Sequence, residues 1–400
     1  MRTNGRGGFL KPKIRISPTG DVLSDHSFGE TTLEPIAQIK HAQDRESESD
    51  SYHSHYAEPN PAPSQPDGFL EAIEAEFNLP AEAFFSLSGA LTELAIQHKT
   101  STWIVRLSSL AERLATQEGF QGYDLMPALQ RLLLPSRPGW LAIPADKKER
   151  DYDLSRFDRP QSMIGRPIVG ISEGEDPLVV VAPGIIERSA LHNIMGARGG
   201  GLHGEFWTSK EMRRFVGGMA DRLGLEFNDQ VAAAVAQLGL NARASVKPSD
   251  CLNQKATDEL KRLGDIDVLA ITDNGQHAWV IEAKDIRFCR TLAETASRLS
   301  DYRGVHKKDG KPDNLMRHLR RVDYVRSHVA DLAKRLKLST EPKVHGLVIV
   351  DSPQPMAFLP SHSSPDARTM MLSDLKNVPW GKGWKAASPK IINSKKRRRK

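Results

Sequence analysis

The chain has 400 residues, 39% of them hydrophobic, which suits two or three globular domains with buried cores. Its net charge of +6 is a local feature, because the last six residues, KKRRRK (395–400), carry six positive charges and leave the rest neutral. Overall charge is therefore poor evidence of nucleic-acid binding. This tail can attract phosphate backbones without sequence preference, or it can be a solubilising end with no specific partner.

The sequence also lacks the marks of membrane and secreted proteins. No apolar run reaches the length of a membrane span, and the first residues, MRTNGRGGFLKPK, lack the apolar core of a secretory signal. The two cysteines, Cys251 and Cys289, cannot form a CxxC zinc site, and two lone thiols indicate a reducing compartment. We therefore expect a cytoplasmic protein without a membrane partner.

The first 140 residues divide into a linker and a helical region. In residues 1–66, the runs KIRIS and DVLSD flank the turn PTG and precede the Pro-rich stretch NPAPSQPDG, so we expect a short hairpin and a flexible linker. Residues 67–140 show apolar spacing of three and four, which predicts helices. We expect these helices over FLEAIEAEF, AFFSLSGALTELAIQH, WIVRLSSLAERLA and LMPALQRLLL. No motif in this region specifies a chemical reaction. The role we consider for it is the binding of a protein partner.

Residues 141–204 are expected to form a small α/β region. Two strand-like runs, MIGRPIVGI and LVVVAP, precede a helix-like GIIERSALHNIM. The glycine-rich stretch ARGGGLHGE (197–205) is not a P-loop, because no Gly-Lys-Ser/Thr follows it. We interpret it as a hinge.

The chemistry of the sequence is concentrated in two strand-like runs of residues 205–355. GDIDVLAI (264–271) and AWVIEAKD (278–285) flank Asn274-Gly275, which is a strong hairpin signal. Side chains alternate along a strand, so Glu282 and Lys284 share one face. Counting outward from the turn places Asp267 opposite Glu282, with Cβ atoms about 5 Å apart.

Two opposed carboxylates repel each other, and a divalent cation removes that penalty. Mg²⁺ prefers oxygen ligands, and Lys284 beside it can orient or help deprotonate a water and offset charge on a phosphodiester. An ordinary strand end with a Glu282–Lys284 ion pair is the simpler alternative, because E-x-K is a common pattern.

Asp267 followed by Glu282-Ala283-Lys284 resembles the PD-(D/E)xK, or restriction-endonuclease-like, nuclease superfamily, over residues 205–355. The resemblance implies that Asp267 and Glu282 bind Mg²⁺, or Mn²⁺, with the Ala283 carbonyl, and that Lys284 is catalytic. Family members often carry a glutamate where the helix 223–239 has Asn228. Glu226 is our substitute candidate ligand, although acids near a helix N-terminus are favourable without any metal.

Nucleic-acid contacts are expected after the second strand. The exonuclease branch of the superfamily places a glutamine and a tyrosine four residues apart, and the segment 291–304 has Arg298 and Tyr302 there. Residues 303–321 are rich in basic side chains and have a net charge of +5. A substrate groove and a solvated loop both fit this segment. The candidate phosphate-binding residues are Arg298, Tyr302, Lys307, Lys308, Arg317, Arg320 and Arg321.

The predicted fold class is α/β: a restriction-endonuclease-like C-terminal domain, with a mixed central sheet flanked by helices, follows a mainly helical N-terminal region. A helix over 314–337 and a strand over 344–351 complete that domain, and residues 356–400 are expected to be a flexible basic tail. The predicted function is a Mg²⁺-dependent nuclease that acts on nucleic acid, with DNA preferred. The alternatives are an inactive nuclease-like module that binds nucleic acid or a protein, and a scaffold whose helical half carries the function.

Overall fold

A computed structural model describes strand residues 14–16 and 22–24, and residues 66–382 except 98–101, 138, 140–141, 145–146, 155, 203, 256, 308 and 359–366. Strands β1 (Ile14–Ile16) and β2 (Val22–Ser24) pair antiparallel. The expected linker before residue 66, Lys308 and the basic residues 395–400 lie outside the described residues. Among the residues described, no helix combines the length and apolar character needed to cross a bilayer.

The chain divides into two compact units, each described separately. The N-terminal unit contains Ser51–Gly224 and Arg290–Glu294, and the C-terminal unit contains Leu225–Cys289 and the residues from Thr295 onward. The boundary falls within the helix α9 (Lys210–Gln237).

Helices and a small sheet share one hydrophobic core in the N-terminal unit. The sheet has the order β3-β6-β5-β4, in which β3/β6 and β6/β5 pair antiparallel and β5/β4 parallel. The amphipathic helices bury Phe69, Phe77, Leu91, Leu110 and Leu129 in this core. The elements are α3 (Phe69–Phe77), α4 (Ala81–Gln97), β3 (Trp103–Arg106), α5 (Leu107–Ala115), α6 (Met126–Leu132), β4 (Leu133–Leu134), α7 (Glu149–Tyr152), β5 (Ile168–Gly170), β6 (Leu178–Val181) and α8 (Pro183–Arg198).

The prediction for one helix of this unit is wrong over its first turn. The run WIVRLSSLAERLA begins as the strand β3 and becomes helical only at Leu107. Trp103 and Val105 are buried whereas Ile104 and Arg106 are exposed. This alternation has the period of a strand, and aromatic and β-branched side chains favour it there.

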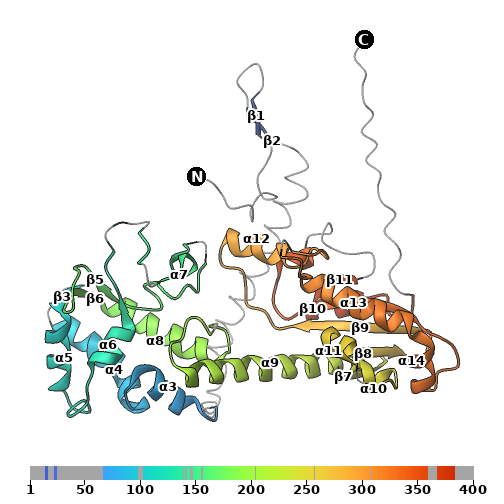
Figure 1. Cartoon of the computed structure of the whole chain (residues 1–400), viewed down its shortest axis with the longest axis horizontal. Coiled ribbons are helices and arrows are strands. Elements are labelled where there is room, and N and C mark those ends of the chain that lie inside the picture. Colours follow the sequence, from blue (N-terminus) through green and yellow to red (C-terminus); the bar gives the residue numbers. More distant parts are fainter. Residues whose placement is uncertain are drawn as a thin grey trace. The chain divides into compact units, whose positions relative to one another are not determined.

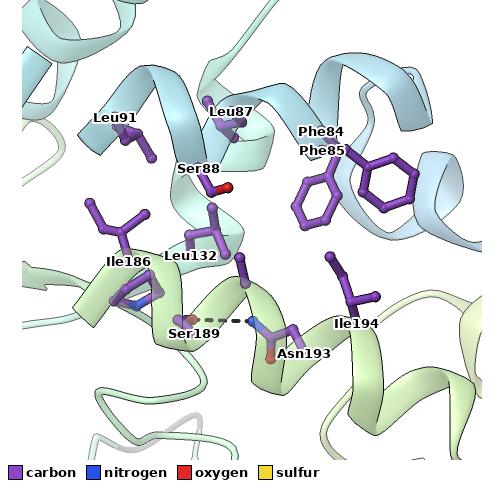
Figure 2. Close-up of a pocket in the computed structure, with 12 residues that line it drawn as sticks. Phe84, Phe85, Leu87, Ser88, Leu91, Leu132, Ile186, Ser189, Asn193 and Ile194 are labelled. Carbon is purple, nitrogen blue, oxygen red and sulfur yellow. Dashed lines mark hydrogen bonds between the residues drawn. The ribbon is translucent and has the colours of Figure 1, made fainter. Parts of the chain in front are cut away.

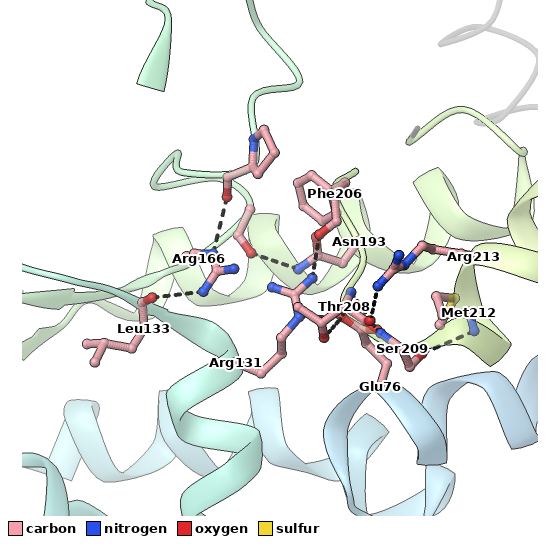
Figure 3. Close-up of polar contacts among 12 residues, drawn as sticks. Glu76, Arg131, Leu133, Arg166, Asn193, Phe206, Thr208, Ser209, Met212 and Arg213 are labelled. Atoms are coloured by element: carbon pink, nitrogen blue, oxygen red, sulfur yellow. Dashed lines mark hydrogen bonds and ion pairs between the residues drawn. The ribbon is translucent and has the colours of Figure 1, made fainter. Parts of the chain in front are cut away.

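A buried ion pair ties α3 and α6 to the start of α9 (Figure 3). The Glu76 carboxylate accepts hydrogen bonds from the Arg131 guanidinium, from the Thr208 N–H and hydroxyl, and from the Ser209 N–H at 2.7 Å. Burial raises the pKa of Glu76, but Arg131 and these N–H donors together hold it below its usual value. The carboxylate therefore neutralises a buried arginine and satisfies N–H groups that precede the helix.

The C-terminal unit is built on a mixed five-stranded sheet with the order β11-β10-β9-β8-β7 (Figure 1). Strands β7/β8 and β8/β9 pair antiparallel, whereas β9/β10 and β10/β11 pair parallel. The elements are β7 (Leu240–Val246), α10 (Pro248–Cys251), α11 (Asp258–Leu263), β8 (Ile266–Thr272), β9 (His277–Lys284), α12 (Leu292–Ser300), α13 (Asn314–Ser327), α14 (Val329–Leu336), β10 (Lys343–Val350), α15 (Pro355–Phe358), β11 (Ala367–Met371) and the 3₁₀ helix η4 (Leu372–Asn377).

The two faces of this sheet have different helical covers. Phe227, Val231 and Val235 of α9 pack with Val268 and Ala270 of β8 and with Trp279, Ile281 and Ala283 of β9. On the opposite face, Val322 and Val325 of α13 pack with Leu269 and Val280. Alternation along β9 therefore turns Glu282 and Lys284 toward the face that α13 covers.

The mixed α/β class, with helices on both faces of a mixed sheet and a helical N-terminal part, is confirmed. In the C-terminal unit, the following details differ from the sequence expectation. The helix 314–337 is interrupted at His328, β7 was missed, and Ala367–Asn377, expected in the flexible tail, form β11 and η4. Ala367 is buried beside β10, so the parallel neighbour supplies order that the Pro- and Ser-rich sequence around it does not indicate.

Candidate functional site

The hairpin between β8 and β9 brings Asp267 and Glu282 together. The observed register pairs Val268 with Ile281, and its continuation by one residue places Asp267 opposite Glu282. Gly275 in the turn has φ +66°, a left-handed conformation that glycine adopts without strain. The spacing read from the sequence around Asn274-Gly275 is therefore the spacing in the fold.

Lys284 bridges the two carboxylates. Its Nζ lies 2.8 Å from Glu282 Oε1 and 3.3 Å from Asp267 Oδ2. The Ala283 N–H also donates to Asp267 Oδ2, at 2.9 Å. The Lys284 side chain is 36% exposed, against 7% for Glu282 and 16% for Asp267. The Lys284 side chain is thus the most accessible of three mostly buried side chains.

The three groups differ in how their pKa values are displaced. Burial, and then the negative charge of Glu282, raise the pKa of Asp267. Burial also raises the pKa of Glu282, but Arg321, Lys284 and His318 together hold it below its usual value. For Lys284, burial lowers the pKa, but the two carboxylates raise it above its usual value. Lys284 is therefore an ammonium at neutral pH and stabilises negative charge; it is not poised to accept a proton.

Helix α13 supplies two groups that the sequence analysis did not place in the site. The Arg321 guanidinium forms an ion pair with Glu282 Oε2 through Nη2, and its Nη1 donates to the Asp265 carbonyl at 2.6 Å. His318 Nδ1 lies 3.7 Å from the same Oε2, and burial lowers the pKa of His318 to about 4. The spacing of three residues between them places both on one side of the helix, which is the only sequence signal for this arrangement.

The placement of Arg321 changes its expected role. The sequence predicts that Arg321 binds phosphate, but only 8% of Arg321 is exposed, and its guanidinium contacts Glu282 and the Asp265 carbonyl before β8. It belongs to the interior of the site.

Tyr302 and Arg298 lie next to the cluster. Tyr302 is 2% exposed, and burial raises its pKa to about 12, an effect that the positive charges of Lys284 and Arg298 partly offset. Tyr302 is therefore a neutral phenol near the catalytic candidates, and Arg298, half-buried on α12, is near it.

The basic segment after Tyr302 is an ordered loop. Asp313 is fully buried, and its carboxylate accepts hydrogen bonds from the N–H groups of Arg303, Val305 and Met316 at 2.8–3.1 Å. The last of these bonds caps α13. Among the described residues around this anchor, the exposed basic side chains are Arg303, Lys307, Lys311, Arg317 and Arg320. Lys307 pairs with Asp301 and Arg320 with His306.

The acid expected from the preceding helix is placed differently. Glu226 is exposed on α9, which packs on the face of the sheet opposite Glu282 and Lys284. Asn228 is buried, and its Nδ2 lies 3.5 Å from the Ser245 hydroxyl on β7. The sheet thus separates the body of α9 from the face that carries the cluster.

The donor set of the cluster suits one hard cation. Asp267 and Glu282 supply carboxylate oxygens from neighbouring strands, and Mg²⁺ is typically held by one or two carboxylates plus water and substrate oxygens. Burial and the negative charge of Glu282 raise the pKa of Asp267, and a cation bound there would offset both effects. Among the described residues, no group of three or more His, Cys, Asp or Glu side chains is placed to hold a metal ion, so a fuller protein cage is absent from them.

A pocket between α4 and α8 of the N-terminal unit offers a contrast (Figure 2). Its lining includes Phe84, Leu91 and Ile186, and its polar groups include Ser189 and Asn193, which are 3.4 Å apart. None of the residues that line it is ionisable. It therefore lacks the charges that phosphoryl chemistry requires.

A protein-family model described as anti-phage protein Upx-like matches residues 5–375 of the 400-residue chain. The match includes both units and the Asp267–Glu282–Lys284 cluster. Comparisons with curated proteins and with solved structures give no match.

Proposed function

The chain belongs to the Upx-like family of anti-phage proteins, and we propose that it serves in phage defence as a Mg²⁺-dependent nuclease that cleaves DNA. As part of the same proposal, the C-terminal unit is a PD-(D/E)xK, restriction-endonuclease-like domain. The observation that carries the proposal is the convergence of Asp267, Glu282 and Lys284 on one face of two neighbouring strands, with Nζ within 3.3 Å of both carboxylates.

Asp267 and Glu282, with the carbonyl of Ala283, would hold the Mg²⁺ ion, for which Mn²⁺ is a common substitute. Such an ion supplies a water of lowered pKa and offsets charge on the phosphate. Asp267 would gain most from it, because burial and Glu282 disfavour its ionised form. The pair is thus better suited to a bound cation than to the metal-free state.

Lys284 is positioned to act on the phosphate itself. The carboxylates keep it protonated, and its side chain is the most exposed of the three. An ammonium at this place donates hydrogen bonds to a phosphodiester oxygen as charge develops there in the transition state. Tyr302 nearby is buried and neutral, so it adds no charge to the site.

The exposed basic side chains of the 303–321 segment support a polyanionic substrate. The buried Asp313 holds the loop at Arg303 and Val305 and caps α13, which carries Arg317 and Arg320, so these side chains extend from a backbone with fixed contacts. Such contacts add affinity without sequence preference. Double-stranded DNA is the first substrate to test, with RNA as the comparison.

One observation favours the alternative, a nuclease-like module that binds without cutting. Lys284 and Arg321 already form ion pairs with the two carboxylates, so their charges are balanced without a metal ion. Under this alternative, the chain binds nucleic acid or a protein partner, and the cluster only stabilises the fold.

A cleavage assay with the full chain separates these functions. Plasmid, linear duplex, single-stranded DNA and RNA are incubated with the protein and Mg²⁺, Mn²⁺ or EDTA. We expect cleavage with Mg²⁺ or Mn²⁺, none with EDTA, and none by Glu282→Gln, while the exposed Glu259→Gln variant cleaves like the parent. The same variants are tested for protection of cells against phage. DNA binding without cleavage of any substrate would refute the nuclease proposal and support the binding module.

A further inference from the structure

The two oxygens of Glu282 face two different cations. Oε1 lies 2.8 Å from Lys284 Nζ, whereas Oε2 forms the ion pair with Arg321. Only 5% of Glu282 is exposed, so solvent contributes little to balancing its charge. A single carboxylate is therefore held between one cation from its own strand and one from α13.

Arg321 is fixed in this position from a second side. Its Nη1 donates to the carbonyl of Asp265, which lies two residues before Asp267. The guanidinium thus connects the turn that leads into β8 with the carboxylate on β9. A planar guanidinium can do this because it presents separate N–H groups to the two acceptors.

The presence of Arg321 changes the charge of the site. The two carboxylates of Asp267 and Glu282 face two cations, Lys284 and Arg321. Without Arg321, Lys284 alone would face both carboxylates.

We propose that Arg321 takes the place of a second divalent ion in the carboxylate site. It occupies Glu282 Oε2, so that Asp267 and Glu282 Oε1, which share Lys284 as their partner, offer a single position for a divalent ion. This inference rests on the proposed function for the choice of ion. In this role Arg321 is a positioning residue that acts through Glu282. It follows that the free protein binds one divalent ion weakly, and that phosphate oxygens of a substrate complete the coordination and tighten it.

The test measures metal binding in the absence of nucleic acid. The full-length chain, freed of metal, is titrated with Mn²⁺ by calorimetry. We expect one ion per chain. Arg321→Gln removes the positive charge and releases Oε2, so it should tighten Mn²⁺ binding by about tenfold or more, or admit a second ion. Arg321→Lys keeps the positive charge but loses the planar guanidinium with its separate N–H groups. Its Mn²⁺ affinity should therefore stay within about threefold of the parent.

Arg326→Gln is the matched control, because Arg326 lies on the same helix but pairs with Asp323. Its Mn²⁺ affinity should equal that of the parent. Thermal unfolding in EDTA checks that each variant folds. If Arg321→Gln does not fold, the parent stoichiometry and the Arg321→Lys affinity still decide.

Two Mn²⁺ ions of similar affinity in the parent would overturn the inference, as would no Mn²⁺ binding, or unchanged affinity in a folded Arg321→Gln variant. Cleavage is scored separately. Binding of one Mn²⁺ with the expected response to Arg321→Gln, but without cleavage of any nucleic acid, would leave this inference standing and refute the nuclease proposal.

Discussion

Each unit buries a glutamate–arginine pair, and the two pairs differ in what surrounds them. Glu76 faces Arg131 and is further bonded by the N–H groups of Thr208 and Ser209, so a single carboxylate receives several donors. Glu282 faces Arg321 but has a second carboxylate, Asp267, on the adjacent strand, and a half-exposed ammonium between them. A buried ion pair with surplus donors stabilises a fold, whereas surplus carboxylates beside solvent favour a cation or a substrate.

The largest expected effect tests the structural pair. Glu76→Ala leaves Arg131 buried and unpaired and removes the partner of the Thr208 and Ser209 N–H groups, so the N-terminal unit should lose about 3–5 kcal/mol of unfolding free energy. Denaturant unfolding, followed by fluorescence and circular dichroism, measures the loss. The exposed Glu71→Ala on the same helix should change it by less than about 0.5 kcal/mol. If Glu76→Ala lowers the unfolding free energy by less than about 1 kcal/mol, the Glu76–Arg131 pair is not a structural one, and the contrast with Glu282–Arg321 fails.

The next effect tests the catalytic role of Lys284. Lys284→Ala should lower the single-turnover cleavage rate by about 10²–10³-fold, because it removes charge stabilisation in the transition state, and should leave Mn²⁺ binding measurable. Lys284→Arg should restore the rate only in part, since a guanidinium differs from an ammonium in shape and basicity. The exposed Lys261→Ala serves as the control. If both Lys284 variants cleave at the parental rate, residues 280–285 (VIEAKD) are an ordinary strand end without a catalytic role.

The third prediction concerns the sign of pH dependence. The pKa of Asp267 is raised, so the folded chain holds this proton more tightly than the unfolded chain, and stability from this group falls as pH rises above the ordinary value of 3.8. Asp267→Asn should therefore be more stable than the parent at pH 7 in EDTA, by about 1 kcal/mol, while losing cleavage. Below pH 3.8 this advantage should disappear.

Glu76 should show the opposite sign. Its pKa is lowered, so its stabilisation is present above the ordinary value of 4.5 and is lost as pH falls through the folded-state value. The deficit of Glu76→Gln relative to the parent should then shrink on acidification. Thermal unfolding of both variants from pH 3 to pH 8 tests the contrast, and parallel curves for the two variants would contradict it.

The smallest expected effect is a change in the salt dependence of DNA binding, which should differ between exposed and buried arginines of α13. Arg317 is exposed, so Arg317→Gln should weaken DNA binding only slightly and reduce the slope of log K against log salt by about one. Fluorescence anisotropy at several salt concentrations measures the slope. The buried Arg321 makes no such contact in this structure, and Arg321→Lys should leave the slope unchanged. An equal change in both variants would mean that the segment binds as one surface.

The sequence by itself determined the hairpin and the residues that it pairs. A turn with Asn274-Gly275 and strands of period two act over fewer than twenty residues, so local geometry alone places Asp267, Glu282 and Lys284 on one face. The same local rules predicted the helices α3 and α4, and failed at Trp103, where strand and helix spacing overlap.

Only the tertiary structure decided what surrounds those residues. Arg321 reaches a carbonyl 56 residues away, and Glu76 reaches an N–H 132 residues away. Both contacts depend on how helices pack against distant elements, and no periodicity within a segment encodes that distance or angle. The packing of α13 through Val322 and Val325 carries Arg321 onto Glu282, and this long-range burial, not the local pattern, sets the charge of the site.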